Sequence, residues 1–260
     1  MNAKAERLYA DIYGSANSAF RADIPFYVEE AQRAGGSVLE LGCRTGVVSA
    51  AVARSGVDAV GVDPSGPMLE LARGKADELD DASGSLSFIE ADLTDFSRAL
   101  DGNFSLVICP QSAFLTMLTV EDQRLLLRNV VRHLLPGGRF IFDIVAPDLD
   151  LLAQDADVAY QVRDVVDPSS GRRFMFWEQS DYDHHDQIAD VRTIAEELNG
   201  DGVVARRVYR DSQVRYANRW EVHHLLRLFG FEVLSLFGSF DREPFESDSA
   251  VMTWVAGARS

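Results

Sequence analysis

The fold is decided by one stretch near the start of the chain, Val38-Leu39-Glu40-Leu41-Gly42-Cys43-Arg44-Thr45-Gly46. An apolar strand runs into a carboxylate, then into a turn with two glycines four residues apart, and then into a helix of small residues at 47–55. Glycines let backbone N–H groups approach a ligand closely, and the amino end of a helix adds a favourable positive field. The stretch therefore predicts a strand, a turn and a helix that hold a ligand at the turn.

Strand and helix patterns alternate downstream of this turn. Apolar strand patterns lie at 59–63, 86–91, 104–109 and 139–145, and helical patterns lie at 67–79 and 120–135. This alternation predicts βαβ units and a parallel sheet that is covered on both faces. Right-handed crossovers bring the carboxyl ends of the strands to one edge, where ligands bind at the switch point. With a helix at 218–228 and two closing strands, 232–240 and 250–256, the sequence predicts a doubly wound α/β domain.

Two further regions do not follow the alternation. Amphipathic stretches at 3–13 and 19–34, the second interrupted by Pro25, predict an N-terminal helical lid over residues 1–36. Four strand patterns with turn-rich links predict an antiparallel β meander, inserted at 158–216 between the two parts of the ligand-binding domain, 37–157 and 217–260. A meander must bury one face, so we expect this one to be a substrate cap or a dimer contact.

Composition excludes several classes of function. The net charge of −16 argues against nucleic acid, because phosphate binding needs clustered lysines and arginines. Five arginines at 206, 207, 210, 215 and 219 are expected to form one solvated strand face that balances nearby acids. Neither the two cysteines nor the five histidines have metal-ligand spacing. No apolar run approaches the roughly 20 residues that cross a membrane, and the polar start of the chain favours the cytoplasm.

A second carboxylate marks the kind of ligand. Asp63 ends the strand after the glycine turn. A carboxylate at that strand end is placed to accept hydrogen bonds from two ribose hydroxyls, which is how adenosine-bearing cofactors are held.

As a set, these motifs resemble class I, Rossmann-like S-adenosylmethionine-dependent methyltransferases. The glycine turn and Asp63 match the family, as do Ile89-Glu90-Ala91-Asp92-Leu93 and Leu134-Leu135-Pro136-Gly137-Gly138-Arg139-Phe140. The resemblance covers residues 9–145 and 218–256. It implies a mostly parallel seven-stranded sheet with an antiparallel edge strand, S-adenosylmethionine as cofactor, and methyl transfer to an O or N nucleophile of a small molecule. The N-terminal tyrosines together with the late antiparallel insert are similar to those of bacterial small-molecule N- and O-methyltransferases.

The resemblance also implies a set of cofactor residues. They are Tyr13, Glu40, Gly42, Cys43, Arg44, Gly46, Asp63, Pro64, Met68, Ala91, Asp92, Leu93 and Cys109. Met68 is expected to be core, with packing against adenine as the alternative; Asp92 can equally cap the helix near Phe96, and the cysteines are expected to be inert fillers of the pocket. Arg44 departs from the family, which usually has glycine there; a side chain with positive φ costs roughly 1–2 kcal/mol. We expect its guanidinium to be exposed to solvent rather than bound to the cofactor carboxylate.

Acceptor residues are expected from the lid, the insert and its exit. They are Tyr9, Trp177, Arg215, Tyr216 and Arg219, each of which can instead serve only in packing. The sequence identifies no general base and no other catalytic residue. The acceptor is expected to be a small molecule, and a homodimer is left open.

Two other functions compete. An NAD-dependent oxidoreductase shares the strand–turn–helix opening, but its G-x-G-x-x-G pattern is not met here because Arg44 takes the place of the second glycine. A protein that binds the cofactor without methylating is the other alternative, supported by Arg44 and by the lack of a recognisable base. The segment Cys109-Pro110-Gln111-Ser112 differs from Asn-Pro-Pro-Tyr, which argues against base-amino methylation of DNA.

Overall fold

The computed structural model describes residues 3–16, 21–80, 83–153, 155–167 and 170–258. Two compact units divide the chain. The parallel-sheet unit comprises Ala22–Asp148 and Tyr216–Ser260, and the antiparallel-sheet unit comprises Met1–Arg21 and Leu149–Arg215. Residues 19 and 20 of the second expected helix lie outside the described part of the chain.

The parallel-sheet unit contains a seven-stranded sheet in the order β10-β11-β5-β4-β1-β2-β3. Its strands are β1 (Val38–Leu41), β2 (Ala59–Asp63), β3 (Leu86–Glu90), β4 (Phe104–Cys109), β5 (Leu134–Val145), β10 (Phe231–Phe237) and β11 (Val251–Ala258). Strands β1 to β5 pair in parallel, and β11 pairs antiparallel with both β5 and β10. The expected doubly wound sheet with an antiparallel edge is confirmed.

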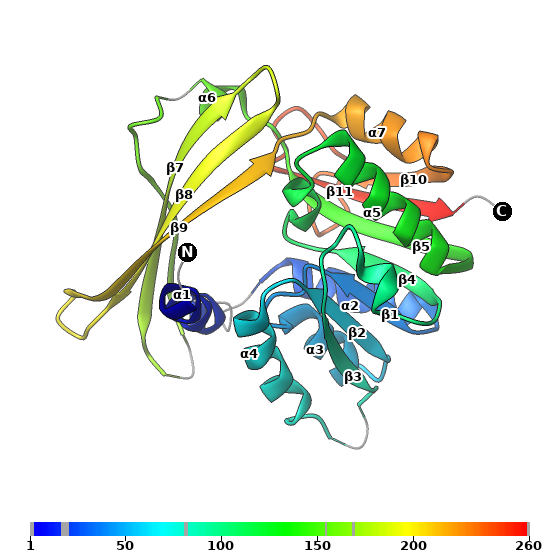
Figure 1. Cartoon of the computed structure of the whole chain (residues 1–260), viewed down its shortest axis with the longest axis horizontal. Coiled ribbons are helices and arrows are strands. Elements are labelled where there is room, and N and C mark those ends of the chain that lie inside the picture. Colours follow the sequence, from blue (N-terminus) through cyan, green and yellow to red (C-terminus); the bar gives the residue numbers. More distant parts are fainter. Residues whose placement is uncertain (1–2, 17–20, 81–82, 154, 168–169, 259–260) are drawn as a thin grey trace. The chain divides into compact units, whose positions relative to one another are not determined.

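Helices cover this sheet on both faces (Figure 1). They are α2 (Asp23–Ala34), α3 (Val47–Arg54), α4 (Gly66–Ala76), α5 (Val120–His133) and α7 (Arg219–Leu228), with 3-10 turns at Phe96–Arg98 and Ala113–Thr116. Phe26 and Tyr27 of α2 pack with Val48 and Val52 of α3 against Val38 and Leu106 of the central strands. Pro25 does not interrupt α2, because it lies in the first turn, where a missing N–H costs nothing.

The antiparallel-sheet unit is built from β6 (Tyr160–Val166), β7 (Arg173–Asp183), β8 (Ile188–Leu198) and β9 (Val204–Arg215), paired in sequence order. The short helix α6 (Leu149–Leu152) precedes them. Each strand pairs antiparallel with the next, as in the predicted meander. Phe176, Ala195 and Val208 stand side by side across β7, β8 and β9 and are all buried.

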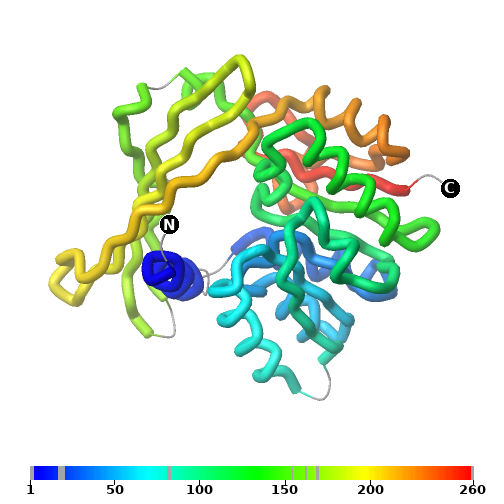
Figure 2. Tube along the Cα trace, viewed as in Figure 1, coloured from blue at the N-terminus to red at the C-terminus, as the bar shows by residue number. Residues whose placement is uncertain are grey.

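Helix α1 (Ala3–Ala16) belongs to this same unit and lies against strands β7, β8 and β9 (Figure 2). Residues 1–36 therefore divide between the units, since α1 joins the antiparallel sheet and α2 joins the parallel sheet. The meander's apolar face was expected to meet the active-site rim or a second subunit; within the unit, the N-terminal helix packs on it. The contact joins segments about 160–200 residues apart, which no local pattern reveals.

Charged contacts connect α1 with the sheet. Asp11 of α1 forms ion pairs with Arg206 (2.8 Å) and Arg172 (3.7 Å). The Arg210 guanidinium lies 4.8 Å from the centre of the Tyr9 ring. Arg207, one residue along β9, pairs instead with Glu196. Arg206 and Arg207 thus balance acids as expected, but the expectation of one strand face is wrong, because successive side chains on a strand point to opposite faces and Arg219 lies on α7.

No helix among the described residues is long and apolar enough to span a membrane.

Candidate functional site

The predicted ligand turn lies at the carboxyl edge of the parallel sheet. Strand β1 is flanked by β2 on one side and β4 on the other, so the chain order reverses beside it. In open α/β sheets, ligands bind in the crevice outside the strand ends at this position. Gly42 and Cys43 donate backbone hydrogen bonds to the Val62 carbonyl, and Gly46 closes the turn on the Cys43 carbonyl.

Two glycines of the turn have positive φ angles, +73° at Gly42 and +67° at Gly46. A Cβ at Gly42 would lie 2.6 Å from the Cβ of Ala113, and one at Gly46 would lie 2.6 Å from the Phe88 ring. Both the dihedral angles and the space therefore require glycine.

Asp63 faces the turn from the end of β2. Its carboxylate is buried and accepts hydrogen bonds from the backbone N–H of Arg44 (2.8 Å) and of Ser65 (2.9 Å). These two bonds tie the glycine turn to the start of α4. A carboxylate has about four acceptor positions, so this arrangement is compatible with further hydrogen bonds from hydroxyl groups.

Glu40 has a different immediate partner. Its buried carboxylate accepts hydrogen bonds from the backbone N–H of Ser49 (2.7 Å) and from the Ser49 hydroxyl. Glu40 therefore fixes the first turn of α3 against β1. Lys75 of α4 stabilises the preceding glycine turn, since its ammonium donates to the Thr45 carbonyl (2.8 Å).

Arg44 occupies the turn between the two glycines with φ = +51°. The guanidinium is half-buried and donates through one Nη to Gln111 Oε1 (2.7 Å) and through the other to the Gln111 carbonyl (3.1 Å). The expectation of a solvent-exposed guanidinium is wrong, because the loop after β4 comes close enough to bind it.

The loop after β4 has two consecutive residues with positive φ, Gln111 (+54°) and Ser112 (+57°). Their N–H groups donate to the two carboxylate oxygens of Asp143, at 3.0 and 3.3 Å. The Tyr27 hydroxyl of α2 donates to the same carboxylate at 2.5 Å. Asp143, on β5, therefore holds this loop in a conformation that side chains rarely adopt.

Burial shifts the titration of this group. It raises the pKa of Asp143 to about 6, with the nearby Asp23 adding to the effect while the Tyr27 and loop hydrogen bonds oppose it. Burial also raises the pKa of Tyr27 well above its ordinary value, with the neighbouring Asp143 charge contributing. The tyrosine therefore remains the donor in this pair.

Cys43 and Cys109 are both buried free thiols. Burial raises the pKa of each well above its ordinary value, helped by Glu40 and Asp63 beside Cys43 and by Asp143 beside Cys109. Neither is a thiolate at neutral pH, so neither is a nucleophile.

The remaining predicted cofactor residues on this edge have mixed settings. Met68 and Leu93 are buried, Pro64 is exposed, and Ala91 follows β3 with partial exposure. Asp92 is exposed, and one of its oxygens accepts from the N–H (2.7 Å) and hydroxyl (2.6 Å) of Thr94. Asp92 thus orders the turn toward the 3-10 helix at Phe96–Arg98.

Four of the other predicted residues lie in the antiparallel-sheet unit. Tyr9 and Tyr13 stack on each other on α1, with ring centres 5.8 Å apart. Trp177 donates its indole N–H to Glu196 (3.2 Å), and Arg215 donates to Gln187 (3.3 Å).

The last two belong to the parallel-sheet unit. Tyr216 is its first residue after β9, and Arg219 begins α7 with its guanidinium over the Trp220 ring (4.7 Å). Packing roles are thus visible for most of the predicted acceptor residues.

Sequence reasoning missed Tyr27, Lys75, Gln111 and Asp143. A signal existed for Asp143, the lone acid in the apolar run of β5, and for Gln111, which follows a strand at the switch point. Tyr27 and Lys75 look like ordinary residues of amphipathic helices, and only the tertiary contacts identify them.

The residues at this edge fit an adenosine-bearing cofactor. They supply a buried carboxylate at the end of β2, two glycines with positive φ and the amino end of α3. Arg44 is the one charged residue of the turn itself, and the Lys75 ammonium contacts the turn at the Thr45 carbonyl. No group of three metal-ligating side chains occurs among the described residues.

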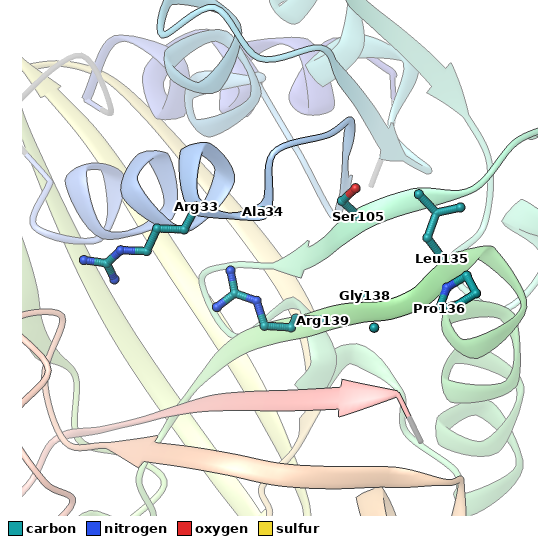
Figure 3. A pocket seen from close by; sticks show the side chains of 8 residues that line it. Arg33, Ala34, Ser105, Leu135, Pro136, Gly138 and Arg139 are labelled. Carbon is teal, nitrogen blue, oxygen red and sulfur yellow. The ribbon is translucent and has the colours of Figure 1, made fainter. Parts of the chain in front are cut away.

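A cavity of about 380 Å³ opens at the opposite edge of the sheet, near the start of β4 and β5 (Figure 3). Its lining includes Arg33, Ser105 and Arg139 and none of the predicted site residues. Both arginines are ion-paired with Glu30, at 2.7 and 2.6 Å. The cavity therefore lies apart from the site built on the glycine turn.

Comparisons with known proteins agree on one family. A methyltransferase-domain family model matches residues 38–138. The cypemycin N-terminal methyltransferase of a Streptomyces species is 28% identical over 221 residues, which are 85% of this chain and 82% of that protein.

Solved structures give the same fold. The CcbJ methyltransferase of Streptomyces caelestis superposes with a TM-score of 0.75 at 22% identity, covering 92% of this chain and 97% of that one. CalS10, an amino pentose methyltransferase of Micromonospora echinaspora solved with S-adenosylmethionine bound, has a TM-score of 0.67 at 18% identity, with 96% of each chain covered. Neither an oxidoreductase nor a cofactor-binding protein without methyltransferase activity is supported by these matches.

Proposed function

We propose that this chain, a class I S-adenosylmethionine-dependent methyltransferase acting on small molecules, methylates the nitrogen of an amine. The similarity to cypemycin N-terminal methyltransferase carries the proposal, because it extends over 85% of the chain rather than over the cofactor domain alone. The amino pentose methyltransferase with the same fold is named for an amino sugar, which adds support from a second acceptor class.

The charge of the chain favours an amine over an anionic acceptor. A net charge of −16 favours the approach of cations, and amines are protonated in water at neutral pH. When bound, S-adenosylmethionine supplies a methyl group to the nitrogen lone pair while the carbon–sulfur bonding pair returns to sulfur. The nitrogen must lose a proton to become nucleophilic, and the chain's task is to align it and exclude water.

For the cofactor, we propose that Asp63 accepts the ribose hydroxyls and that the glycine turn, residues 42–46, surrounds the amino-acid portion. Support comes from the buried carboxylate and the positive φ angles described above. Glu40 and the 91–93 segment are included because of the family resemblance. Tyr9, Tyr13, Trp177, Arg215, Tyr216 and Arg219 stay proposed ligand contacts on the same basis.

Cellular setting and assembly belong to the same proposal. Two free thiols and the acidic composition suit a cytoplasmic enzyme that does not bind nucleic acid.

A homodimer is proposed for the antiparallel sheet, on the face where Trp177, Ile194 and Tyr209 are partly exposed. Light scattering of wild type and of Tyr209→Lys measures this: a dimer that persists in the variant, or a monomeric wild type, contradicts it.

The test of the acceptor class is a competition between nucleophiles. Purified protein is incubated with S-adenosylmethionine and matched pairs of acceptors, such as an amino sugar and its hydroxyl analogue, or a short peptide with a free and with an acetylated N-terminus. We expect S-adenosylhomocysteine only with the amines, and a rate that rises as pH approaches the amine pKa, near 8 for an α-amino group. Methylation of the hydroxyl partners alone would overturn the proposal.

A further inference from the structure

Three non-glycine residues with positive φ meet at the switch point: Arg44, Gln111 and Ser112. Only two others, Gln187 and Arg242, occur elsewhere in the described part of the chain. Such backbone strain persists only where the surrounding structure enforces it, and it clusters at functional sites. At Arg44 the cost is avoidable, because glycine would adopt the same φ freely.

The strained residues form one connected network. The backbone N–H of Arg44 donates to Asp63, and its guanidinium donates to Gln111. The N–H of Gln111 donates to Asp143, which the Tyr27 hydroxyl also binds. The Arg44 guanidinium is therefore held at a defined place between the turn after β1 and the loop after β4.

The charges at this edge show what the guanidinium is suited to recognise. Glu40 and Asp63 are buried acids of the two adjoining strand ends, and Asp143 lies behind the Gln111 loop. Arg44 is the only lysine or arginine in residues 42–46, 63–65, 91–94 and 109–112, the four segments that follow β1, β2, β3 and β4. The Lys75 ammonium also reaches this edge, but it is bound to the Thr45 carbonyl at 2.8 Å, so Arg44 is the cation that these four segments themselves supply to an anionic group. A guanidinium binds a carboxylate through two parallel N–H···O bonds.

We propose that Arg44 recognises the carboxylate of the cofactor's methionine portion and that Gln111 orients its guanidinium for that contact. The inference rests on the proposed binding of the cofactor at the glycine turn. Arg44 is then a specificity residue for the cofactor, and Gln111 is a positioning residue that acts through it. The strained φ of Arg44 places a cation where glycine would leave only backbone N–H groups.

The test compares two ligands that differ only in the carboxylate: S-adenosylhomocysteine and its decarboxylated analogue. Calorimetry gives the affinity of wild type and variants for each. Wild type should prefer S-adenosylhomocysteine at least tenfold. Arg44→Gln, which keeps most of the side-chain length and can still hydrogen-bond Gln111, should remove that preference and leave the affinity for the decarboxylated analogue within about twofold. Arg207→Gln, an equal change in net charge in the other unit, should retain the full preference.

Gln111 variants distinguish two roles of Gln111: orienting Arg44 for the ligand carboxylate, or only stabilising the loop through its contact with Arg44. Gln111→Ala should reduce the preference severalfold, because the guanidinium loses an orienting partner. Gln111→Glu should reduce it further, because a carboxylate at this position neutralises the guanidinium. A purely structural role predicts that Gln111→Glu keeps more of the preference than Gln111→Ala, since a glutamate would strengthen the contact with Arg44.

Several results would overturn the inference. They are an unchanged preference in Arg44→Gln, an equal loss for both ligands, or a wild type without a preference. Amine methylation is tested separately with acceptors, so it can fail while this inference stands, and the reverse also holds. Thermal unfolding of each variant identifies any general loss of structure.

Discussion

The two units of this molecule are stabilised in different ways. In the parallel-sheet unit, β1 is buried at all four positions, and backbone hydrogen bonds from closely packed turns define the ligand edge. In the antiparallel-sheet unit, guanidinium groups join α1 to the strands: Arg172 and Arg206 both pair with Asp11 and with Glu197. The comparison teaches that the edge built on the glycine turn depends on shape and backbone geometry, whereas the helix–sheet contact depends on partly exposed charge.

The largest effect should come from the shape of the glycine turn. In Gly42→Ala, the methyl group would meet the Ala113 Cβ at 2.6 Å on a backbone with φ = +73°, so we expect a loss of about 2–4 kcal/mol in unfolding free energy. Urea unfolding measures it. Gly74→Ala is the matched control, since this exposed helical glycine has open space around it and should gain up to about 1 kcal/mol. Equal effects of the two changes would contradict the steric argument.

The second largest effect should be a change of stability with pH, which arises from Asp143 in the parallel-sheet unit. Asp143 has a folded pKa of about 6 against about 4 when unfolded, so it favours folding below pH 4 and loses that contribution as pH rises to 6. Two pKa units correspond to about 3 kcal/mol. The stability of wild type relative to Asp143→Asn should therefore fall by up to that amount between pH 4 and pH 7. A flat difference in urea unfolding across this range would mean that Asp143 ionises normally.

Asp63→Ala should weaken cofactor binding by at least tenfold. Each hydrogen bond from a hydroxyl to a charged acceptor contributes about 1.5–3 kcal/mol, and tenfold corresponds to about 1.4 kcal/mol. Calorimetry with S-adenosylhomocysteine measures the loss. Asp211→Asn, at an exposed ion pair in the antiparallel-sheet unit, serves as the control and should leave that affinity unchanged. Unaltered binding in Asp63→Ala would remove Asp63 from the cofactor site.

The smallest effect is expected at the charged contact. Glu197→Gln leaves Arg172 and Arg206 with Asp11 as their only shared carboxylate, and these arginine side chains are 32% and 38% exposed, so solvent screens much of the lost interaction. We expect about 1 kcal/mol of lost stability, decreasing as salt is added. Asp211→Asn, which breaks the more exposed pair with Arg192, should change stability less than Glu197→Gln does. Salt-independent losses would indicate that packing, not charge, joins the elements.

Much of the fold could be predicted because its signals are local. The glycine turn, Asp63 and the regular alternation of strands and helices lie within short windows, and the structure has β2 and β4 with the predicted bounds. The capping box of Thr119 and Asp122 likewise starts α5 at the predicted residue. The partners of the site residues were harder to predict. Arg44 was expected to face solvent, but its guanidinium is bound by Gln111, which lies 67 residues away in the sequence.

By itself, the sequence determined the doubly wound sheet, the glycine turn after β1 and the four-stranded meander, because hydrophobic periodicity and the φ demands of glycine act over a few residues. Only the tertiary structure decided where the long-range partners go. It assigned α1 to the antiparallel sheet rather than to a lid with α2, and it brought Arg44, Gln111, Asp143 and Tyr27 into one network. Such contacts join residues about 30–120 positions or more apart, and their energies come from burial and charge pairing that no short window of sequence contains.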